Sequence, residues 1–207
     1  ATLRSVLGEQ VKQAGSLVAP DRCRFDFTHY TALTEREKER IEELVNERII
    51  ENHPVVTAEM EIDQAIASGA MALFDEKYGD KVRVVTVQDV SKELCGGTHA
   101  KASGDIGLFK IVTEGGVAAG VRRIEILAGR RAYEEIRKEE QSLREVGQLL
   151  KVSDTDVVGR VERLISQLKD AEKELDRLKH KMQTSEAGAL VSDAKMIKGV
   201  RVLARRV

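Results

Sequence analysis

The chain has 207 residues, of which 42% are hydrophobic, 33% are charged and only 3% are aromatic, and it contains no tryptophan. This length allows one domain with an appendage, but the composition is lean for a single compact globule, so we expect part of the chain to be thin and solvated. The formal net charge of −1 excludes a strongly basic protein, so any contact with nucleic acid must come from a local patch.

The sequence contains two cysteines, Cys23 and Cys95, and the number of cysteines indicates the redox state of the cellular compartment. The sequence shows neither an apolar run of about 18 residues nor a signal-peptide layout, which together with the low cysteine content predicts a soluble protein of the reducing cytoplasm without a membrane segment. A disulfide is not expected there. Each cysteine is therefore either a buried small hydrophobe or a metal ligand or nucleophile.

The first fifty residues predict two helices and a strand. Apolar residues at helical spacing indicate a helix over residues 3–15, and alternation over residues 24–27 indicates a short strand. Thr34 and Glu37 have the spacing of a capping box, followed by apolar residues at helical spacing between 41 and 49. A second helix is therefore expected to begin at Thr34.

The following segment mixes strands with short helical stretches. We expect strands over residues 55–62, 82–87, 106–112 and 121–127, a helix from Asp63 to Phe74, and turns at Gly79-Asp80 and Gly115-Gly116. Strands joined by short turns favour an α+β domain with a mostly antiparallel sheet, which we place at residues 1–129.

From residue 130 to about 190 the chain predicts a helical arm, because glycine and proline almost vanish and charges are dense. Residues 153–156 divide it. A heptad seam follows at Val161, Leu164, Leu168, Ala171, Leu175, Leu178 and Met182, which favours a coiled coil. Alternatively the arm is a helical hairpin in which Ile136, Leu143 and Leu150 fold back on that seam. Residues 191–207 resemble the beginning of a further, truncated domain, with a first strand at 199–203.

Cys95 and His99 form the candidate metal site. Their spacing can bring a thiolate and an imidazole to one side of a loop, as zinc requires, and Gly96-Gly97 between them allows close approach of backbone to a ligand. The competing interpretation is a buried cysteine near an unrelated histidine. Zinc needs about four ligands, and the remaining histidines, His29, His53 and His180, have no companion spacing.

Several segments together carry a specific resemblance to the editing domain of alanyl-tRNA synthetases. They are E-L-C-G-G-T-H-A at 93–100, G-D-I-G-L-F-K-I at 104–111, G-V-R-R-I-E at 120–125, and shorter matches at 15–18, 24–27 and 69–74. The resemblance spans nearly all of residues 1–129, and the arm resembles the helical linker of that family.

The resemblance implies hydrolysis of serine or glycine wrongly esterified to tRNA(Ala), in a zinc-dependent site. Cys95 and His99 would be zinc ligands, and the family's two other ligands are histidines of an H-x-x-x-H helix upstream of Ala1. Gly96, Gly97 and Thr98 would line the aminoacyl group, through backbone N–H groups and a hydroxyl. Gln13, late in the first predicted helix, matches a position on the substrate side. ATP and Mg²⁺ belong to the aminoacylation domain of the family, outside this chain.

The densest cationic cluster near the predicted sheet is a candidate contact for tRNA phosphates. It comprises Arg122, Arg123, Arg130 and Arg131. Asp26, by its place in the alternating strand, is expected to point outward. No DNA partner is expected.

Two further functions remain open from the sequence. The helical arm alone could act as an interaction or dimerisation module, giving a homodimer through the coiled coil. The chain could also represent a free-standing editing protein, which shares the C-G-G-T-H signature.

Overall fold

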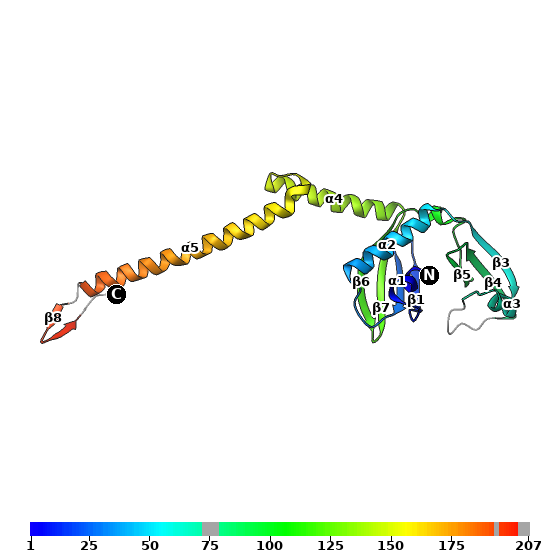
Figure 1. The fold of residues 1–207 in the computed structure, drawn as a ribbon, viewed down its shortest axis with the longest axis horizontal. Helices are drawn as coiled ribbons and strands as arrows, with labels where there is room; N and C mark the ends of the chain where they lie inside the picture. Colours follow the sequence, from blue (N-terminus) through cyan, green and yellow to red (C-terminus); the bar gives the residue numbers. More distant parts are fainter. Residues whose placement is uncertain (72–78, 193–194, 203–207) are drawn as a thin grey trace. The chain divides into compact units, whose positions relative to one another are not determined.

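A computed structural model of the chain describes residues 1–71, 79–192 and 195–202 (Figure 1). Its contacts divide the chain into two units, residues 1–138 and 139–207. The first unit contains α1 (Thr2–Leu7), β1 (Gln13–Val18), β2 (Cys23–Thr28), α2 (Glu35–Ile50), β3 (Val55–Glu61), α3 (Ile62–Ala67), β4 (Lys81–Val87), β5 (Ser91–Leu94), η1 (Ser103–Ile106), β6 (Phe109–Ala118) and β7 (Val121–Ala128). Antiparallel sheets mixed with helices confirm the predicted α+β class.

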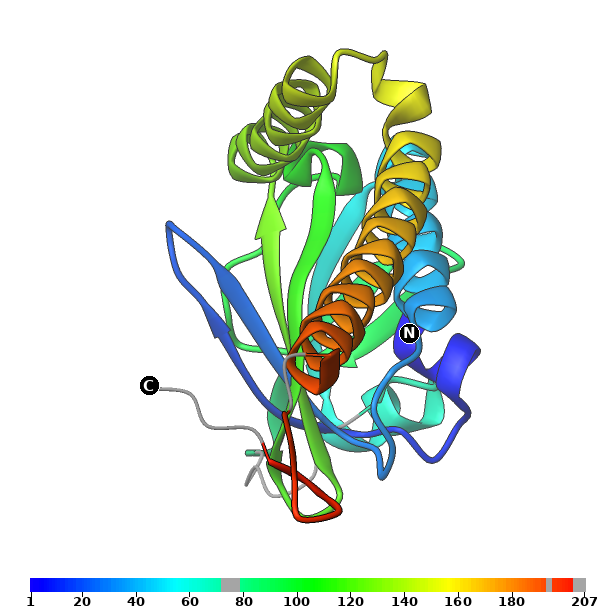
Figure 2. The ribbon, with the colours of Figure 1, turned by 90° about the vertical axis from the view of Figure 1, so that its left-hand side faces the viewer.

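The larger sheet has the order β1-β2-β7-β6 with antiparallel pairing throughout, and Figure 2 shows β6 and β7 side by side along their length. One face packs against α1 and α2. The buried core there consists of Val11, Phe27, Leu33, Ile41, Ile111, Ile124 and Ile126. Apolar side chains from the sheet and the helices thus share one core, as expected for a sheet with one covered face.

Helix α2 begins at the predicted capping box. The Thr34 hydroxyl accepts a hydrogen bond from the Glu37 N–H (3.2 Å), and the Glu37 carboxylate accepts one from the Thr34 N–H (2.8 Å). Ile41 and Ile49 are buried, so the predicted apolar face of this helix is confirmed.

Polar side chains of α2 occupy the outer edge of β6 at its start. The Asn46 side chain both accepts from the Phe109 N–H and donates to the Phe109 carbonyl, each at 2.9 Å. The Glu42 carboxylate accepts from the Ile111 N–H. Over these first residues of β6, the two side chains satisfy backbone groups that a neighbouring strand would otherwise pair.

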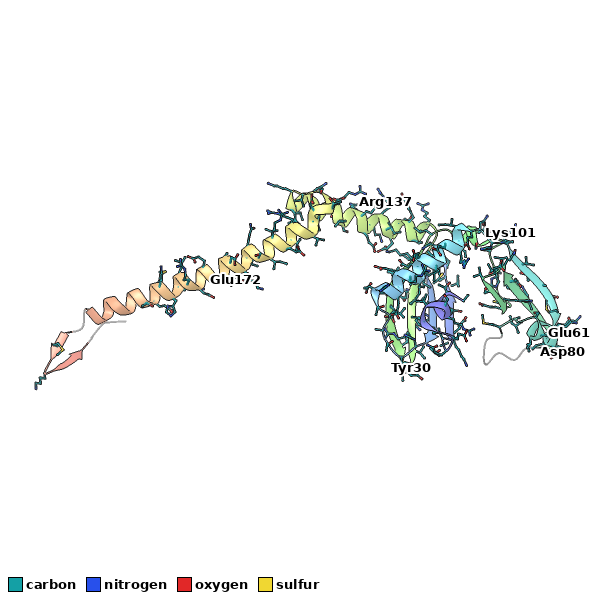
Figure 3. The ribbon with its side chains drawn as sticks, in the orientation of Figure 1. Tyr30, Glu61, Asp80, Lys101, Arg137 and Glu172 are labelled. Carbon is teal, nitrogen blue, oxygen red and sulfur yellow. The ribbon has the colours of Figure 1, made fainter. Side chains whose placement is uncertain are left out.

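The second sheet has the order β3-β4-β5 and packs with α3 around Ala65, Ala70, Val82, Val84 and Leu94. Its far end, where Glu61 and Asp80 are labelled in Figure 3, is closed by a hydrogen bond from the Ile62 N–H to the Asp80 carbonyl (2.9 Å). The helix predicted from Asp63 to Phe74 is shorter in the structure, and residues 72–78 lie outside the described part.

The first helix ends at Leu7, so its predicted extension to Gly15 is wrong. Gly8 has φ of 108°, a conformation that ends the helix, and residues 13–18 pair with β2. Leu3, Val6, Leu7 and Val11 have the spacing of one helix face, but the pairing of the following residues with β2 prevents the helix from continuing beyond Leu7.

The predicted turn at Gly115-Gly116 is also wrong, because both glycines lie within β6. They pair with Arg123 and Arg122 of β7, and a Cβ on Gly116 would stand 3.3 Å from Nη1 of Arg122. Gly116 thus leaves room for the Arg122 side chain, whereas a Cβ on Gly115 would meet no described atom within 4 Å. The chain reverses at Gly120, where φ is 71°.

The arm contains α4 (Arg130–Leu150), η2 (Asp154–Asp156) and α5 (Val157–Ser192), followed by a hairpin of β8 (Lys195–Ile197) and β9 (Val200–Val202). The break predicted at residues 153–156 is confirmed. The strand predicted at 199–203 corresponds to β9, except that Leu203 lies outside the described residues.

The heptad seam of α5 is exposed to solvent. Leu168 is 62% exposed and Leu175 53%, and Glu172 projects from the same helix in Figure 3. The seam is thus not covered by a helix folded back through Leu143, which is itself exposed, so the hairpin alternative does not describe this chain. Among the described residues, no helix has both the length and the apolar character needed to cross a bilayer.

The junction between α4 and α5 is built by backbone hydrogen bonds at the end of α4. The Val152 N–H donates to the Gly147 carbonyl (3.0 Å) and the Lys151 N–H to the Gln148 carbonyl (3.1 Å), the two bonds of a Schellman motif. Lys151 has φ of 54°, where glycine is normally preferred. Gly147 is buried there, and a Cβ on it would stand 3.1 Å from the Val152 carbonyl oxygen.

We expect Lys151→Gly to stabilise this junction by roughly 0.5–1 kcal/mol, because glycine adopts the left-handed conformation without steric strain. Thermal unfolding followed by circular dichroism, with amide hydrogen exchange at Val152, measures the gain. Lys169→Gly, in the interior of α5, is the matched control and should lower stability. A loss of stability in both variants would contradict the strain at Lys151.

Candidate functional site

The C-G-G-T-H loop leaves the end of β5. The Cys95 N–H donates to the Arg83 carbonyl (3.1 Å), which continues the β4–β5 pairing by one residue, and Nη1 of Arg83 donates to the Gly96 carbonyl (3.3 Å). Residues 96–99 are exposed, whereas Cys95 is half-buried. The sheet thus fixes the base of the loop and leaves its other residues accessible.

The two glycines of the loop differ in their surroundings. A Cβ on Gly97 would lie 3.6 Å from Sγ of Cys95, whereas a Cβ on Gly96 would meet no described atom within 4 Å. Packing therefore does not require glycine at position 96.

The donors of the predicted metal site are only partly present. The other histidines have local partners: His29 contacts Thr31, His53 contacts Glu51 and His180 contacts Thr184. No three His, Cys, Asp or Glu side chains among the described residues converge as metal ligands. Cys95 and His99 have the right chemistry for zinc, but two donors do not complete its usual four-ligand shell.

Cys23 behaves as a small, half-buried hydrophobic residue and not as a metal ligand or nucleophile. It packs beside the core of the larger sheet, it forms no disulfide, and burial raises the pKa of its thiol. A raised pKa disfavours the thiolate that a nucleophile or metal ligand needs.

A cleft of about 690 Å³ opens between the larger sheet and the segment that runs from α3 to β5. Phe25, Ile124 and Ile126 form part of its wall from β2 and β7, and Gln13 and Glu93 also line it. Sequence reasoning missed this cleft because its walls come from segments far apart in the chain. Glu93 could have been noticed, since it stands two residues before Cys95 and side chains alternate along a strand.

Gln13 lies in this cleft as the first residue of β1, not late in a helix as predicted. A β-bulge follows it, because Gln13 pairs with Phe27 and Gly15 with Asp26, leaving one extra residue between. The Thr28 hydroxyl accepts from the Lys12 N–H (3.0 Å), which holds the segment entering the bulge. Bulges of this kind redirect side chains at functional sites.

Asp26 is only 8% exposed, although its outward position on the strand agrees with the prediction. It does lie on the face of β2 opposite the core, but Arg123 covers it with two hydrogen bonds, from Nε (2.7 Å) and Nη2 (2.8 Å). These hydrogen bonds hold the pKa of the Asp26 carboxyl below its ordinary value, and Arg24 nearby adds to the effect.

The four arginines of the predicted phosphate cluster all form ion pairs, which they share among three carboxylates. Arg122 contacts Glu114 (2.6 Å) and Arg123 contacts Asp26, and because the two arginines are neighbours in β7 they lie on opposite faces of the sheet. Arg130 and Arg131 both contact Glu134 in the first turns of α4. Their contact with tRNA stays a prediction.

Comparison with known proteins adds a second line of observation. Residues 82–125 match the family described as threonyl and alanyl tRNA synthetase second additional domain. The chain is 52% identical over 204 residues to an alanine–tRNA ligase of Halorhodospira halophila and 53% identical over 207 residues to that of Desulfitobacterium hafniense. These alignments cover 99% and 100% of the chain and 24% of each relative. A ligase of Solibacter usitatus is 48% identical over 99% of the chain and 23% of its own length, so the chain spans about a quarter of these relatives.

The Asp26–Arg123 ion pair makes stability depend on pH in a defined direction. Because the pKa of Asp26 is lowered by folding, the pair stabilises the fold fully above the unfolded value of about 3.9 and is lost as pH falls further, through the folded value. We expect Asp26→Asn to lower Tm by about 3–8 °C at pH 7. The difference from the unmodified chain should shrink below about pH 4.

Thermal unfolding across pH 2–8 measures this difference. Glu134→Gln removes an ion pair at an exposed position and is the matched control, with an expected change of about 1 °C or less. Equal effects of the two variants at pH 7 would contradict a structural role for Asp26.

Proposed function

We propose, from the second additional domain in residues 82–125 and the 48–53% identity to alanine–tRNA ligases, that this segment removes wrongly esterified amino acids from tRNA(Ala). The substrates are seryl- and glycyl-tRNA(Ala), and the reaction is hydrolysis of the ester. Ligation of alanine, with ATP and Mg²⁺, belongs to other parts of such a ligase. The proposal places the chain in cytoplasmic protein synthesis, with tRNA(Ala) as its partner.

The observation that carries this proposal is that the C-G-G-T-H loop lies within the matched domain and begins two residues after Glu93, which lines an apolar cleft. The cleft volume of about 690 Å³ falls within the range of roughly 300–1,000 Å³ typical of small-ligand sites. An aminoacylated terminal nucleoside is a ligand of this size. In this proposal the exposed loop supplies polar groups at the ester, and the cleft supplies the apolar walls around it.

The proposed roles of the residues follow from their chemistry. The N–H groups of Gly96 and Gly97 face the carbonyl oxygen of the ester, and the Thr98 hydroxyl tests for the hydroxyl of a seryl side chain. Gln13 contacts the substrate from within the cleft. Arg122, Arg123, Arg130 and Arg131 remain the proposed contacts to phosphates, in which tRNA would compete with their present carboxylate partners.

Zinc is the proposed cofactor, held by Cys95 and His99 with two further ligands from outside the described residues. When bound, it lowers the pKa of a water or holds the amino group of the substrate. The loop contributes independently of the metal, because the paired sheet fixes where Cys95 and Gly96 stand.

We expect the 207-residue chain, purified without added zinc, to carry well under one metal per chain and to hydrolyse seryl-tRNA(Ala) hardly faster than the uncatalysed reaction. Two ligands leave two positions of zinc open, so its affinity should fall by orders of magnitude. A longer polypeptide, with an H-x-x-x-H helix preceding Ala1, should recover both zinc and hydrolysis. Zinc determination beside a deacylation time course measures both.

Cys95→Ala and His99→Ala in the longer polypeptide should abolish this gain, whereas Cys23→Ala is the matched control and should retain it. Brisk hydrolysis by the 207-residue chain would show that the additional helix is not needed. Failure of the longer, zinc-loaded polypeptide to hydrolyse seryl-tRNA(Ala) would overturn the proposed function.

The exposed seam of α5 favours a second function, self-association through the helical arm to give a homodimer. Isolated helices rarely keep a continuous apolar stripe in solvent, and Leu168 and Leu175 stand on such a stripe. This function is compatible with editing, since it uses the other unit of the chain.

We expect the double variant Leu168→Lys and Leu175→Lys to be monomeric at concentrations where the unmodified chain associates, because charge on the seam opposes its burial. Sedimentation velocity over a range of concentrations measures this shift. Glu172→Lys, on the same helix but off the seam, is the control and should associate normally. If the unmodified chain sediments as a monomer at all concentrations, the proposed self-association is wrong.

A further inference from the structure

Glu93 is a half-buried carboxylate in the wall of the cleft. Among the described residues it accepts no side-chain hydrogen bond and forms no ion pair, although its neighbours in β5 are held by regular pairing with β4. A carboxylate beside apolar walls is unfavourable without a partner of opposite charge. Its position therefore calls for a cationic partner.

The wall around Glu93 is mostly apolar. Ile66, Ala70 and Met71 accompany it on one side of the cleft, and Phe25 and Ile124 come from the larger sheet. Two cationic residues, Arg4 and Lys12, also line the cleft. Nη1 of Arg4 lies 2.9 Å from Sδ of Met71, and Arg4 makes no ion pair with Glu93. In such surroundings a charge–charge interaction is screened less than in open water.

Glu93 also has a defined relation to the C-G-G-T-H loop. Because the Cys95 N–H continues the pairing with β4, residues 93 and 95 belong to one extended run and project to the same side. Two residues along a strand are about 6.6 Å apart. A ligand whose ester carbonyl lies at the loop would therefore place a group a few bonds away beside Glu93.

We propose that the Glu93 carboxylate binds the α-ammonium group of the aminoacyl ester in this cleft. This inference rests on the proposed editing function and identifies the chemical feature of the substrate that the site requires. An α-amino group titrates at about pH 7.7–8, so a free aminoacyl ester presents a cation at neutral pH. An ester whose amino group is acylated, as in peptidyl-tRNA, presents none and adds bulk.

The consequence is a second level of selectivity that does not depend on the side chain of the amino acid. In the proposed function the Thr98 hydroxyl distinguishes serine from alanine, whereas Glu93 distinguishes aminoacyl esters from N-acylated ones. The site would then ignore peptidyl-tRNA, whose hydrolysis would end protein synthesis prematurely.

The test uses two non-hydrolysable ligands, 3′-deoxy-3′-(L-seryl)amino-adenosine and the same compound acetylated on the seryl nitrogen. Binding to the 207-residue chain is measured by NMR titration in EDTA, so that no metal can hold the amine. We expect the free amine to bind about 10–100-fold more tightly than the acetylated compound, as a charge-assisted hydrogen bond allows.

Glu93→Gln should reduce this preference to about one to three-fold, mainly by weakening binding of the free amine, because the amide keeps the shape of the side chain without its charge. Glu9→Gln is the matched control, since Glu9 is the other acidic residue that lines the cleft and is more exposed. It should retain the preference. The NMR spectrum of each variant shows whether it is folded. Acetylation removes the charge of the seryl amino group and so tests the contact with Glu93 from the side of the ligand.

An unchanged preference in Glu93→Gln would overturn the proposal, as would the absence of any preference in the unmodified chain. Neither result would bear on the editing function, which the deacylation assay of the longer polypeptide decides by itself. Conversely, a Glu93-dependent preference with no deacylation would leave an amine-binding cleft without the proposed reaction.

Discussion

The pairing of β2 with β7 is the constraint on which the rest of the first unit depends. It runs from Cys23 opposite Ile126 to Thr28 opposite Val121, and it joins segments about a hundred residues apart in the chain. Closing so long a loop costs conformational entropy that local structure cannot offset. Contacts on both faces of the two strands offset this entropic cost. On one face Phe27 and Ile124 are buried in the core, and on the other Asp26 and Arg123 form an ion pair with two hydrogen bonds.

The candidate site is built from this same pairing. Phe25, Ile124 and Ile126 form part of the cleft wall, so the strands that close the fold also shape the surface that a substrate would contact. The second sheet lies within the closed loop and brings Glu93, two residues before the C-G-G-T-H loop, to the cleft from the other side. Rigid strands thus position the backbone groups on which ester recognition would depend.

The sequence predicted features that local interactions determine and missed those set by distant contacts. The Thr34–Glu37 capping box and the break before α5 are local, and both are present. The placement of Gln13 depends on the pairing of β1 with β2. Gly115 and Gly116 lie within β6 and not in a turn, and Gly116 leaves room for Arg122 of the next strand. The Cys95–His99 loop was recognisable as a motif, but its cleft was not, because the walls meet only after the sheets have formed.

Side chains of α2 limit how the larger sheet can be extended along β6. An asparagine side chain carries the same amide donor and acceptor as a peptide unit, so Asn46 acts toward Phe109 as a single residue of a neighbouring strand. With Glu42 bound to the Ile111 N–H, the first residues of β6 offer no free template for a further strand. An incoming strand is therefore blocked from this part of β6, which shortens the stretch of the edge that is open to edge-to-edge aggregation.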